Sequence, residues 1–238
     1  SNDSVVLSGL TPNTSYDFYV REICGANDSS FWTGPFSYTT NCTPFTAPYS
    51  QDFDGAPAVD PFAGISCWST AGPGADDIEL TDSPDFGIDP APSAPNSVEM
   101  NDGNLSGGDT SALVTPAFSD LPTGMNRIRF KAAFENTAAT LYVGVVSDIT
   151  DPTTFTLIDS VTTGTVDVYE EYIVQLDNQA LIGSAENIVF VHGSSIYEIY
   201  IDDFFYEANP CMNYSVDLGN DTSYCEGNVF TTTLDAGN

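Results

Sequence analysis

The chain has 238 residues, 41% of them hydrophobic and 12% aromatic, which is enough for a sizeable core and for more than one domain. It carries 34 acidic residues against 4 lysines and arginines, a formal net charge of −30. Such a surface repels nucleic acids and anionic membranes and attracts divalent cations, of which calcium is the natural counterion. Abundant Thr, Ser, Asn, Asp, Gly and Pro indicate a secreted or cell-surface all-β protein, and no apolar run approaches the roughly 20 residues of a membrane span.

The first piece of the chain, residues 1–42, contains LSGLTPNTSYDFYVREICGANDSSFWTGPFSYTT. It follows the spacing Leu-x-Pro-x-Thr-x-Tyr and then alternates apolar residues: Leu10, Pro12, Thr14, Tyr16, Phe18 and Val20. This pattern resembles the last strands of a fibronectin type III domain, of which we expect only the final third here. The resemblance implies a tyrosine corner, with the Tyr16 hydroxyl bonded to nearby backbone, and a final hairpin at SSFWTGPFSYTT.

The central piece, residues 43–209, reads as regularly spaced short strands separated by Gly, Pro, Asn and Asp clusters. The expected strands lie in 47–56, 78–83, 97–102, 111–118, 126–134, 140–148, 155–162, 169–177, 187–194 and 197–207. Only one helical turn, within 178–185, is expected. This order predicts a β-sandwich.

The central piece also resembles the MAM-like jelly rolls, including choice-of-anchor J domains, of bacterial surface proteins. The matching residues are Phe53 and Asp54 in DFDG, Cys67 with Trp68, LVTPAF at 113–118 and Ile-Asp-Asp at 201–203. The third piece, residues 210–238, contains VDLGNDT and CEG ahead of a strand that ends in LDAG, and it resembles the opening strands of Ig-like or PKD-like repeats. The predicted fold is therefore all-β, tandem β-sandwiches with one complete jelly roll between two truncated Ig-like domains.

Five cysteines point to structural disulfides in an oxidising compartment, with at least one cysteine lacking an internal partner. Cys24 and Cys42 lie at opposite ends of the predicted hairpin, roughly 20 Å apart, too far for a bridge. We expect Cys42 to pair with Cys67, with Trp68 in the core beside them rather than exposed for sugar stacking. Cys225 is expected to pair beyond residue 238, and Cys211 either likewise or with Cys225.

Two adjacent acids, Asp202 and Asp203, interrupt the apolar alternation of YEIYIDDFFYE. Unless a bulge intervenes, one of them points to the apolar side, where a carboxylate needs a counter-charge, several hydrogen bonds or a proton. The bases Arg127, Arg129 and Lys131 alternate on the face opposite their apolar neighbours, so they are poor partners for an inward acid. Metal is the favoured neutraliser; carboxylates capped by N–H groups, or facing solvent at a bulge, are the alternative.

The resemblance also implies a ligand set for this metal. In related jelly rolls an acid after the first strand's phenylalanine shares calcium with the first aspartate of the closing strand, here Asp54 and Asp202. The loop before SVEMND adds Asn96 and Ser97. Calcium would be structural, tying the first strand to the last. The usual acid at position 54 in such jelly rolls is glutamate, and this chain has the shorter aspartate there.

Arg127, Arg129 and Lys131 form a basic stripe, which could be either a binding site for an anion or the partner of an acidic stripe on a neighbouring strand. The second is favoured, because Glu171, Gln175 and Asp177 share one face of YEEYIVQLD.

Nothing in the sequence indicates catalysis: there is one histidine, His192, expected at a strand end, and no nucleophile elbow, zinc-protease helix or phosphate loop. Four aromatic residues near strand ends could stack on sugars if they are exposed: Tyr142, Phe155, Tyr169 and Tyr197. Alternating aromatic residues are, however, more often part of the core. DSV at 3–5 and 159–161 resembles short bacterial O-glycosylation sites, which would place glycans on Ser4 and Ser160.

The sequence thus predicts a non-enzymatic, calcium-stabilised adhesion module of a large, secreted bacterial cell-surface protein. The architecture resembles adhesins that gliding bacteria export by type IX secretion. Its partners would be glycans or extracellular ligands, without nucleic acid or membrane insertion. The alternative is a carbohydrate-binding module of a secreted glycan-degrading enzyme, and a third possibility is a structural spacer without a ligand.

Overall fold

The computed structural model of the chain describes residues 5–25, 28–82, 87–101, 111–149, 151, 154–193 and 196–210. Two small two-stranded sheets precede the sandwich, formed by β1 (Ser15–Val20) with β4 (Thr33–Thr39) and by β2 (Ile23–Gly25) with β3 (Asp28–Ser29). Short helical turns are η1 (Ala75–Asp77), η2 (Leu121–Thr123) and α1 (Gln179–Ile182). No helix in the described part of the chain is both long and apolar enough to cross a membrane.

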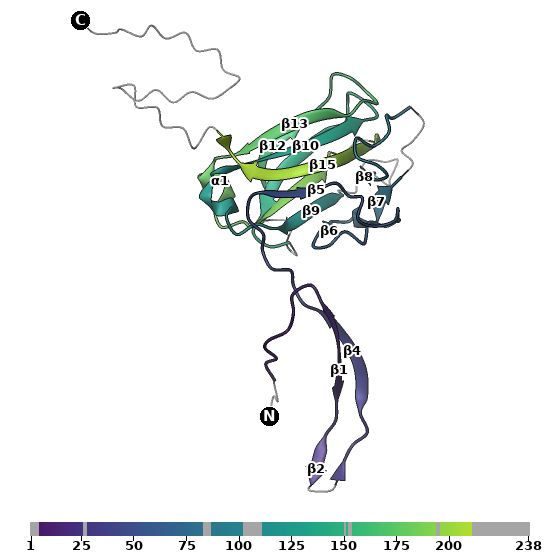
Figure 1. The fold of residues 1–238 in the computed structure, drawn as a ribbon, viewed down its shortest axis with the longest axis vertical. Coiled ribbons are helices and arrows are strands. Elements are labelled where there is room, and N and C mark those ends of the chain that lie inside the picture. The colour runs from purple at the N-terminus through teal and green to yellow at the C-terminus, as the bar shows by residue number, and fades with distance from the viewer. Residues whose placement is uncertain are drawn as a thin grey trace, which may run out of the picture.

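Two antiparallel sheets form the body of the molecule (Figure 1). The six-stranded sheet has the order β13-β10-β15-β8-β7, with β5 pairing with β15; its strands are β5 (Tyr49–Gln51), β7 (Ile78–Thr81), β8 (Ser97–Met100), β10 (Asn126–Phe134), β13 (Glu170–Leu176) and β15 (Ile199–Ala208). The five-stranded sheet has the order β12-β11-β14-β9-β6, with β6 (Ser69–Ala71), β9 (Ala112–Ala117), β11 (Leu141–Val146), β12 (Thr156–Val161) and β14 (Asn187–His192). Most connections after β9 cross between the sheets. The predicted all-β sandwich is confirmed.

The core lies between the two sheets because the strands alternate apolar and polar residues. In β10, Ile128 and Phe130 are fully buried, whereas the bases that alternate with them point outward. Phe130 meets Phe190 of the facing sheet edge-on, with 5.0 Å between ring centroids. Burial of side chains of this size stabilises the fold by about 1.5–3 kcal/mol each, so such contacts hold the sheets together.

Each of the ten predicted strand ranges contains an observed strand, and the predicted helical turn is α1. The three-residue strand β6 lies outside these ten ranges. It follows Trp68 directly and is too short for periodicity to reveal.

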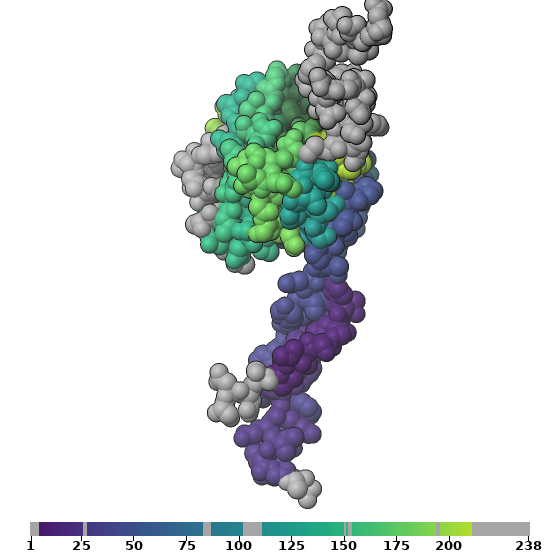
Figure 2. Space-filling view, turned by 90° about the vertical axis from the view of Figure 1, so that its left-hand side faces the viewer, coloured from purple at the N-terminus to yellow at the C-terminus, as the bar shows by residue number. Residues whose placement is uncertain are grey.

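The hairpin of β1 and β4 projects from the sandwich as a narrow arm (Figure 2). Tyr16 pairs with Tyr38 and Phe18 with Phe36, so one face of the hairpin is aromatic. The backbone N–H of Thr11 donates to the Tyr16 hydroxyl at 2.8 Å, which is the bond predicted for a tyrosine corner. The assignment of this arm to a fibronectin type III domain stays a prediction.

Cys42 and Cys67 form the predicted disulfide, with 5.9 Å between their Cα atoms, and join the segment after the arm to the sandwich. Trp68 is 6% exposed and packs edge-on against Phe204, so its predicted core position is confirmed. Its indole N–H donates to the Tyr49 hydroxyl at 2.9 Å.

Among the described cysteines, Cys24 is free and exposed. Cys211, Cys225 and nearly all of the predicted third domain lie outside the described residues, as does Ser4.

Candidate functional site

The two acids of the closing strand lie at a β-bulge. Arg129 is opposite Phe205, but Lys131, two residues on, is opposite Asp202, so β15 holds one residue more than β10 here. Asp203 adopts φ +49°, a conformation that Asp tolerates better than most residues. Since the flanking apolar residues of β15 remain in the core, the extra residue places both carboxylates on the outward side of the sheet.

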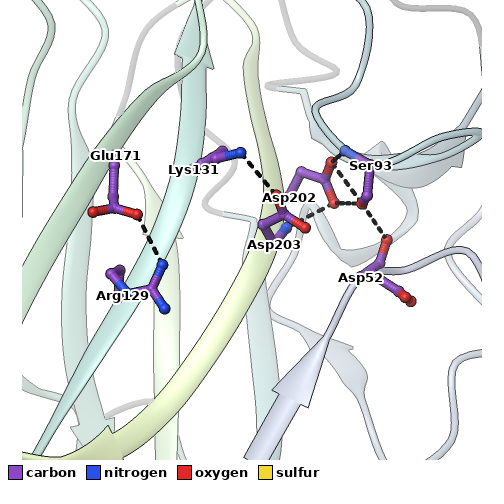
Figure 3. Close-up of polar contacts among 7 residues, drawn as sticks. All are labelled: Asp52, Ser93, Arg129, Lys131, Glu171, Asp202 and Asp203. Atoms are coloured by element: carbon purple, nitrogen blue, oxygen red, sulfur yellow. Dashed lines mark hydrogen bonds and ion pairs between the residues drawn. The ribbon is translucent and has the colours of Figure 1, made fainter.

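Asp202 is nevertheless fully buried, because the segment around Ser93 covers it (Figure 3). The Ser93 backbone N–H donates to Asp202 Oδ2 at 2.9 Å, and the Ser93 hydroxyl lies 3.0 and 3.1 Å from the two carboxylate oxygens. The backbone N–H of Asp203 donates to Oδ1 at 2.7 Å. Burial disfavours the charged form and raises the pKa of Asp202 to about 6, although these hydrogen bonds oppose the rise.

Asp203 takes a different partner: Lys131 Nζ lies 3.0 Å from its Oδ2 (Figure 3). The bases were expected to be poor partners only for an inward acid, and Asp203 is not inward. The bulge turns this carboxylate onto the same outward face as the bases.

The rest of the stripe is ion-paired, as favoured from the sequence, but mostly with other acids than expected. Arg129 Nη1 lies 2.8 Å from Glu171 Oε2 in a diagonal pair, since the register places Ile173 opposite Arg129 and Glu171 opposite Lys131. Arg127 Nη2 lies 2.8 Å from Glu207 Oε1, on the closing strand. Gln175 is opposite Arg127 in the register and accepts a hydrogen bond from Asn209 instead.

The remaining predicted calcium ligands, Asp54, Asn96 and Ser97, also lie at this end of the six-stranded sheet. The Asn96 backbone N–H donates to Asp54 Oδ1 at 2.9 Å, and the Asn96 side-chain amide donates to the Phe53 and Ala56 carbonyls at 3.2 and 2.7 Å. Residues 93 and 96 of one segment thus bind the two carboxylates that were predicted to share an ion.

Two buried hydroxyls lie near this cluster. Neither Ser97 Oγ nor the Tyr169 hydroxyl makes a hydrogen bond of normal geometry. Burial raises the pKa of Tyr169 well above its usual value, the nearby Ser97 hydroxyl lowers it in part, and the charges of Asp202 and Glu99 raise it further. These oxygens lie in a buried, acidic environment.

The donor chemistry of the cluster suits calcium, which accepts carboxylate, carbonyl and hydroxyl oxygens. Asp202 is buried without a base, Ser97 has an unsatisfied oxygen, and the Asp52 carbonyl is bound by the Ser93 hydroxyl at 3.2 Å. Within the described residues no three His, Cys, Asp or Glu side chains gather closely enough to hold a metal. An ion here would therefore have at most two carboxylate ligands, and neutral oxygens would have to supply the rest.

The four aromatic residues proposed for sugar stacking separate into two groups. Tyr142 and Phe155 lie on the outward face of the five-stranded sheet, where Tyr142 is 37% exposed. Tyr169 belongs to the cluster beside Asp202, and Tyr197 packs against the main core, where its carbonyl lies 2.7 Å from His192 Nε2. His192 is buried at the end of β14, as predicted for a strand end.

A groove with a volume of about 420 Å³ opens on the outward face of the five-stranded sheet. Its floor contains the buried Val114, Val146 and Val189, which form a small hydrophobic cluster separate from the main core. Its remaining lining residues are Ala71, Gly72, Pro73, Ala112, Asp148, Ile149, Phe155 and Val191.

Gly144 positions Phe155 at this groove. A Cβ at Gly144 would lie 2.4 Å from the Phe155 ring and 2.5 Å from the Thr156 carbonyl, so only glycine lets the ring lie against β11. The pairing of β11 with β12 shifts register at the same point. The groove does not follow from the sequence pattern, although a glycine inside the apolar strand LYVGVV is a signal of close approach.

Ser160, proposed as a glycan acceptor, is exposed on β12 at the edge of the five-stranded sheet. Its position is accessible from solvent.

No family model and no curated protein matches the chain. Among solved structures, the K2 cleaved adhesin domain of Lys-gingipain is similar with a TM-score of 0.51 and 16% identity, over 67% of this chain and 99% of that domain. The K1 domain of Lys-gingipain from Porphyromonas gingivalis W83 gives a TM-score of 0.49 and 21% identity, over 68% of this chain and 99% of that domain. The carbohydrate-binding module TmCBM61, solved with β-1,4-galactotriose, gives a TM-score of 0.38 and 17% identity, over 60% of this chain and 88% of that module.

Proposed function

We propose that this chain is a non-enzymatic extracellular adhesion module of a modular bacterial cell-surface protein. The observation that carries the proposal is the groove on the outward face of the five-stranded sheet. Its volume of about 420 Å³ is in the range of ligand sites, and it is built on strands rather than on loops alone. The sandwich fold shared with the K2 adhesin domain is compatible with this role.

Calcium stabilisation is the second element of the proposal. Asp202 and Asp54 would supply the charged ligands, with Asn96 and Ser97 as neutral ones. Bound calcium would offset the burial of Asp202 and tie the segment after β5 to the closing strand. Because few charges are available, we expect weak binding, on the order of 0.1–1 mM as in other extracellular modules.

Thermal unfolding with and without a chelator tests the calcium site. We expect 5 mM calcium to raise the melting temperature of the wild-type chain, and Asp202→Asn to abolish the shift. Asp203→Asn is the matched control, since Asp203 is already paired with Lys131. An unchanged melting temperature in the wild type removes calcium from the proposal.

A carbohydrate-binding module is the alternative, and the shared face of Tyr142 and Phe155 favours it. Sugars stack on such rings in many binding sites. A Tyr142→Ala variant would then lose binding to one sugar class.

The two functions separate when the whole 238-residue chain is applied to an array of glycans and to an array of extracellular proteins. Saturable binding to proteins supports the adhesion module, and saturable binding to one glycan class supports the alternative. Binding to neither array contradicts both and leaves a structural spacer.

A further inference from the structure

We propose that the groove on the five-stranded sheet binds an apolar side chain of a partner protein that is flanked by lysines or arginines. The inference rests on the proposed function and specifies its ligand. It commits the groove to a cationic protein segment rather than to a sugar.

The lining of the groove argues for a hydrocarbon ligand. Among its side chains only Asp148 is polar; all others are aliphatic or, in Phe155, aromatic. A sugar ring placed there would leave most of its hydroxyls without hydrogen-bond partners, a penalty of the kind that makes polar ligands avoid apolar sites. A leucine or phenylalanine side chain would lose only its contact with water.

The floor of the groove is preformed. Val114 and Val189 are 2% and 3% exposed, and they are held by the ladder between β9 and β14. Phe155 is fixed against Gly144, so the wall it forms does not depend on a ligand. A side chain entering the groove therefore requires little ordering of the protein, which favours binding.

Charge selects the partner. All four lysines and arginines lie either on β10, in the six-stranded sheet, or at Arg21, just after β1. None belongs to the five-stranded sheet, and Asp148 lines the groove. With a net charge of −30, the chain attracts cationic segments and repels anionic ones.

The same charge argues against the two other occupants at hand. A second copy would bring a further −30 to the interface. The chain's own residues 211–238 contain four acids and no lysine or arginine: Asp217, Asp221, Glu226 and Asp235. A basic partner is the occupant that the electrostatics favour.

Isothermal titration of the whole chain with three pentapeptides tests the proposal at 50 mM NaCl. The probes are Lys-Lys-Phe-Lys-Lys, Lys-Lys-Ser-Lys-Lys and Glu-Glu-Phe-Glu-Glu. We expect the first to bind with a Kd on the order of 0.1–1 mM and at least about tenfold more tightly than the other two, because the site needs both the ring and the positive charge.

Two exposed isoleucines provide a matched pair of variants. Ile149, 50% exposed, lines the groove, and Ile173, 45% exposed, lies on the six-stranded sheet. Ile149→Ser should weaken the phenylalanine peptide about fivefold, whereas Ile173→Ser should leave its affinity unchanged. Both variants should fold, since both side chains are half in solvent, and a melting curve checks this.

Three results would overturn the inference: no binding of the phenylalanine peptide, equal binding of the serine peptide, or equal effects of the two variants. If any one of these results is found while the chain still binds extracellular proteins on the array, the adhesion function stands and its site lies elsewhere. If β-1,4-galactotriose or a xylo-oligosaccharide binds instead and Ile149→Ser weakens it, the groove is a sugar site and the carbohydrate-binding alternative stands.

Discussion

The two outward faces of the sandwich differ in chemistry although the strands beneath them are alike. On the six-stranded sheet, the bases of β10 are paired with acids of β13 and β15, and a buried carboxylate lies under the Ser93 segment. On the five-stranded sheet, the outward side chains are valines and alanines around a groove. The first face pairs its charged groups within the chain, and the second leaves hydrocarbon accessible.

This difference indicates a division of roles. Ion pairs and hydrogen bonds on the six-stranded sheet leave few groups free for a ligand, so that face serves the fold. Apolar surface in a preformed groove is in contact with water, and covering it with a partner is favourable. The five-stranded sheet is therefore the face from which we expect binding.

The largest expected effect tests the role of the six-stranded face. The pKa of Asp202 is raised from an ordinary value of 3.8 to about 6, so its protonated form stabilises the fold below pH 4, and this contribution is lost as the pH rises through 6. In the presence of a chelator, the unfolding free energy of the wild type relative to Asp202→Asn should fall by about 2–3 kcal/mol between pH 4 and pH 7. Urea unfolding at several pH values measures this difference.

Asp203→Asn serves as the control for that experiment. Asp203 is next to Asp202 in sequence, but it is only partly buried and it is paired with Lys131. The account fails if both variants show the same pH dependence, because the buried carboxylate would then have no special role.

A second change tests the groove. Gly144→Val would drive Cβ into the Phe155 ring and the Thr156 carbonyl, so we expect a loss of about 1–3 kcal/mol in the unfolding free energy and a distorted groove. Gly164→Val is the control, because a Cβ there meets nothing within 4 Å. Equal stability of the two variants would mean that Phe155 is not held against β11. Urea unfolding of both proteins gives the comparison.

The smallest effect concerns the ion pairs. Lys131→Met removes the partner of Asp203, and Arg129→Met removes that of Glu171. Because these pairs are partly exposed, each change should lower the unfolding free energy by less than about 1 kcal/mol, and less at high salt. A decrease of several kcal/mol in the unfolding free energy would instead mean that the ion pairs of this face are a principal source of stability.

Local patterns predicted most of the fold. Alternation located the strands, and the resemblance to a fibronectin type III domain implied the bond of Tyr16 to the backbone. The pairing of Cys42 with Cys67 followed from their positions just outside motifs of the same sandwich. The adjacent acids Asp202 and Asp203 conflict with the alternation of apolar and polar residues, and a bulge is one of the alternatives that the sequence allows. What alternation lacks is information about which distant segment covers a residue.

The features that sequence reasoning missed are all of that long-range kind. Ser93 is 109 residues from Asp202, and nothing in its own neighbourhood marks it as a hydrogen-bond donor to the closing strand. The groove arises where the turn after β6, the ladder of β9 and β14 and the residues before β12 meet. Gly144 was the one local signal, and its meaning depends on Phe155.

Methyl chemical-shift mapping of the whole chain with Lys-Lys-Phe-Lys-Lys tests the division of roles most directly. We predict that the shifts concentrate on the methyl groups of Val114, Val146, Val189 and Ile149, and that Ile173 on the opposite face does not respond. Shifts centred on Ile173 and the β10 stripe, with the groove methyl groups unchanged, would contradict it.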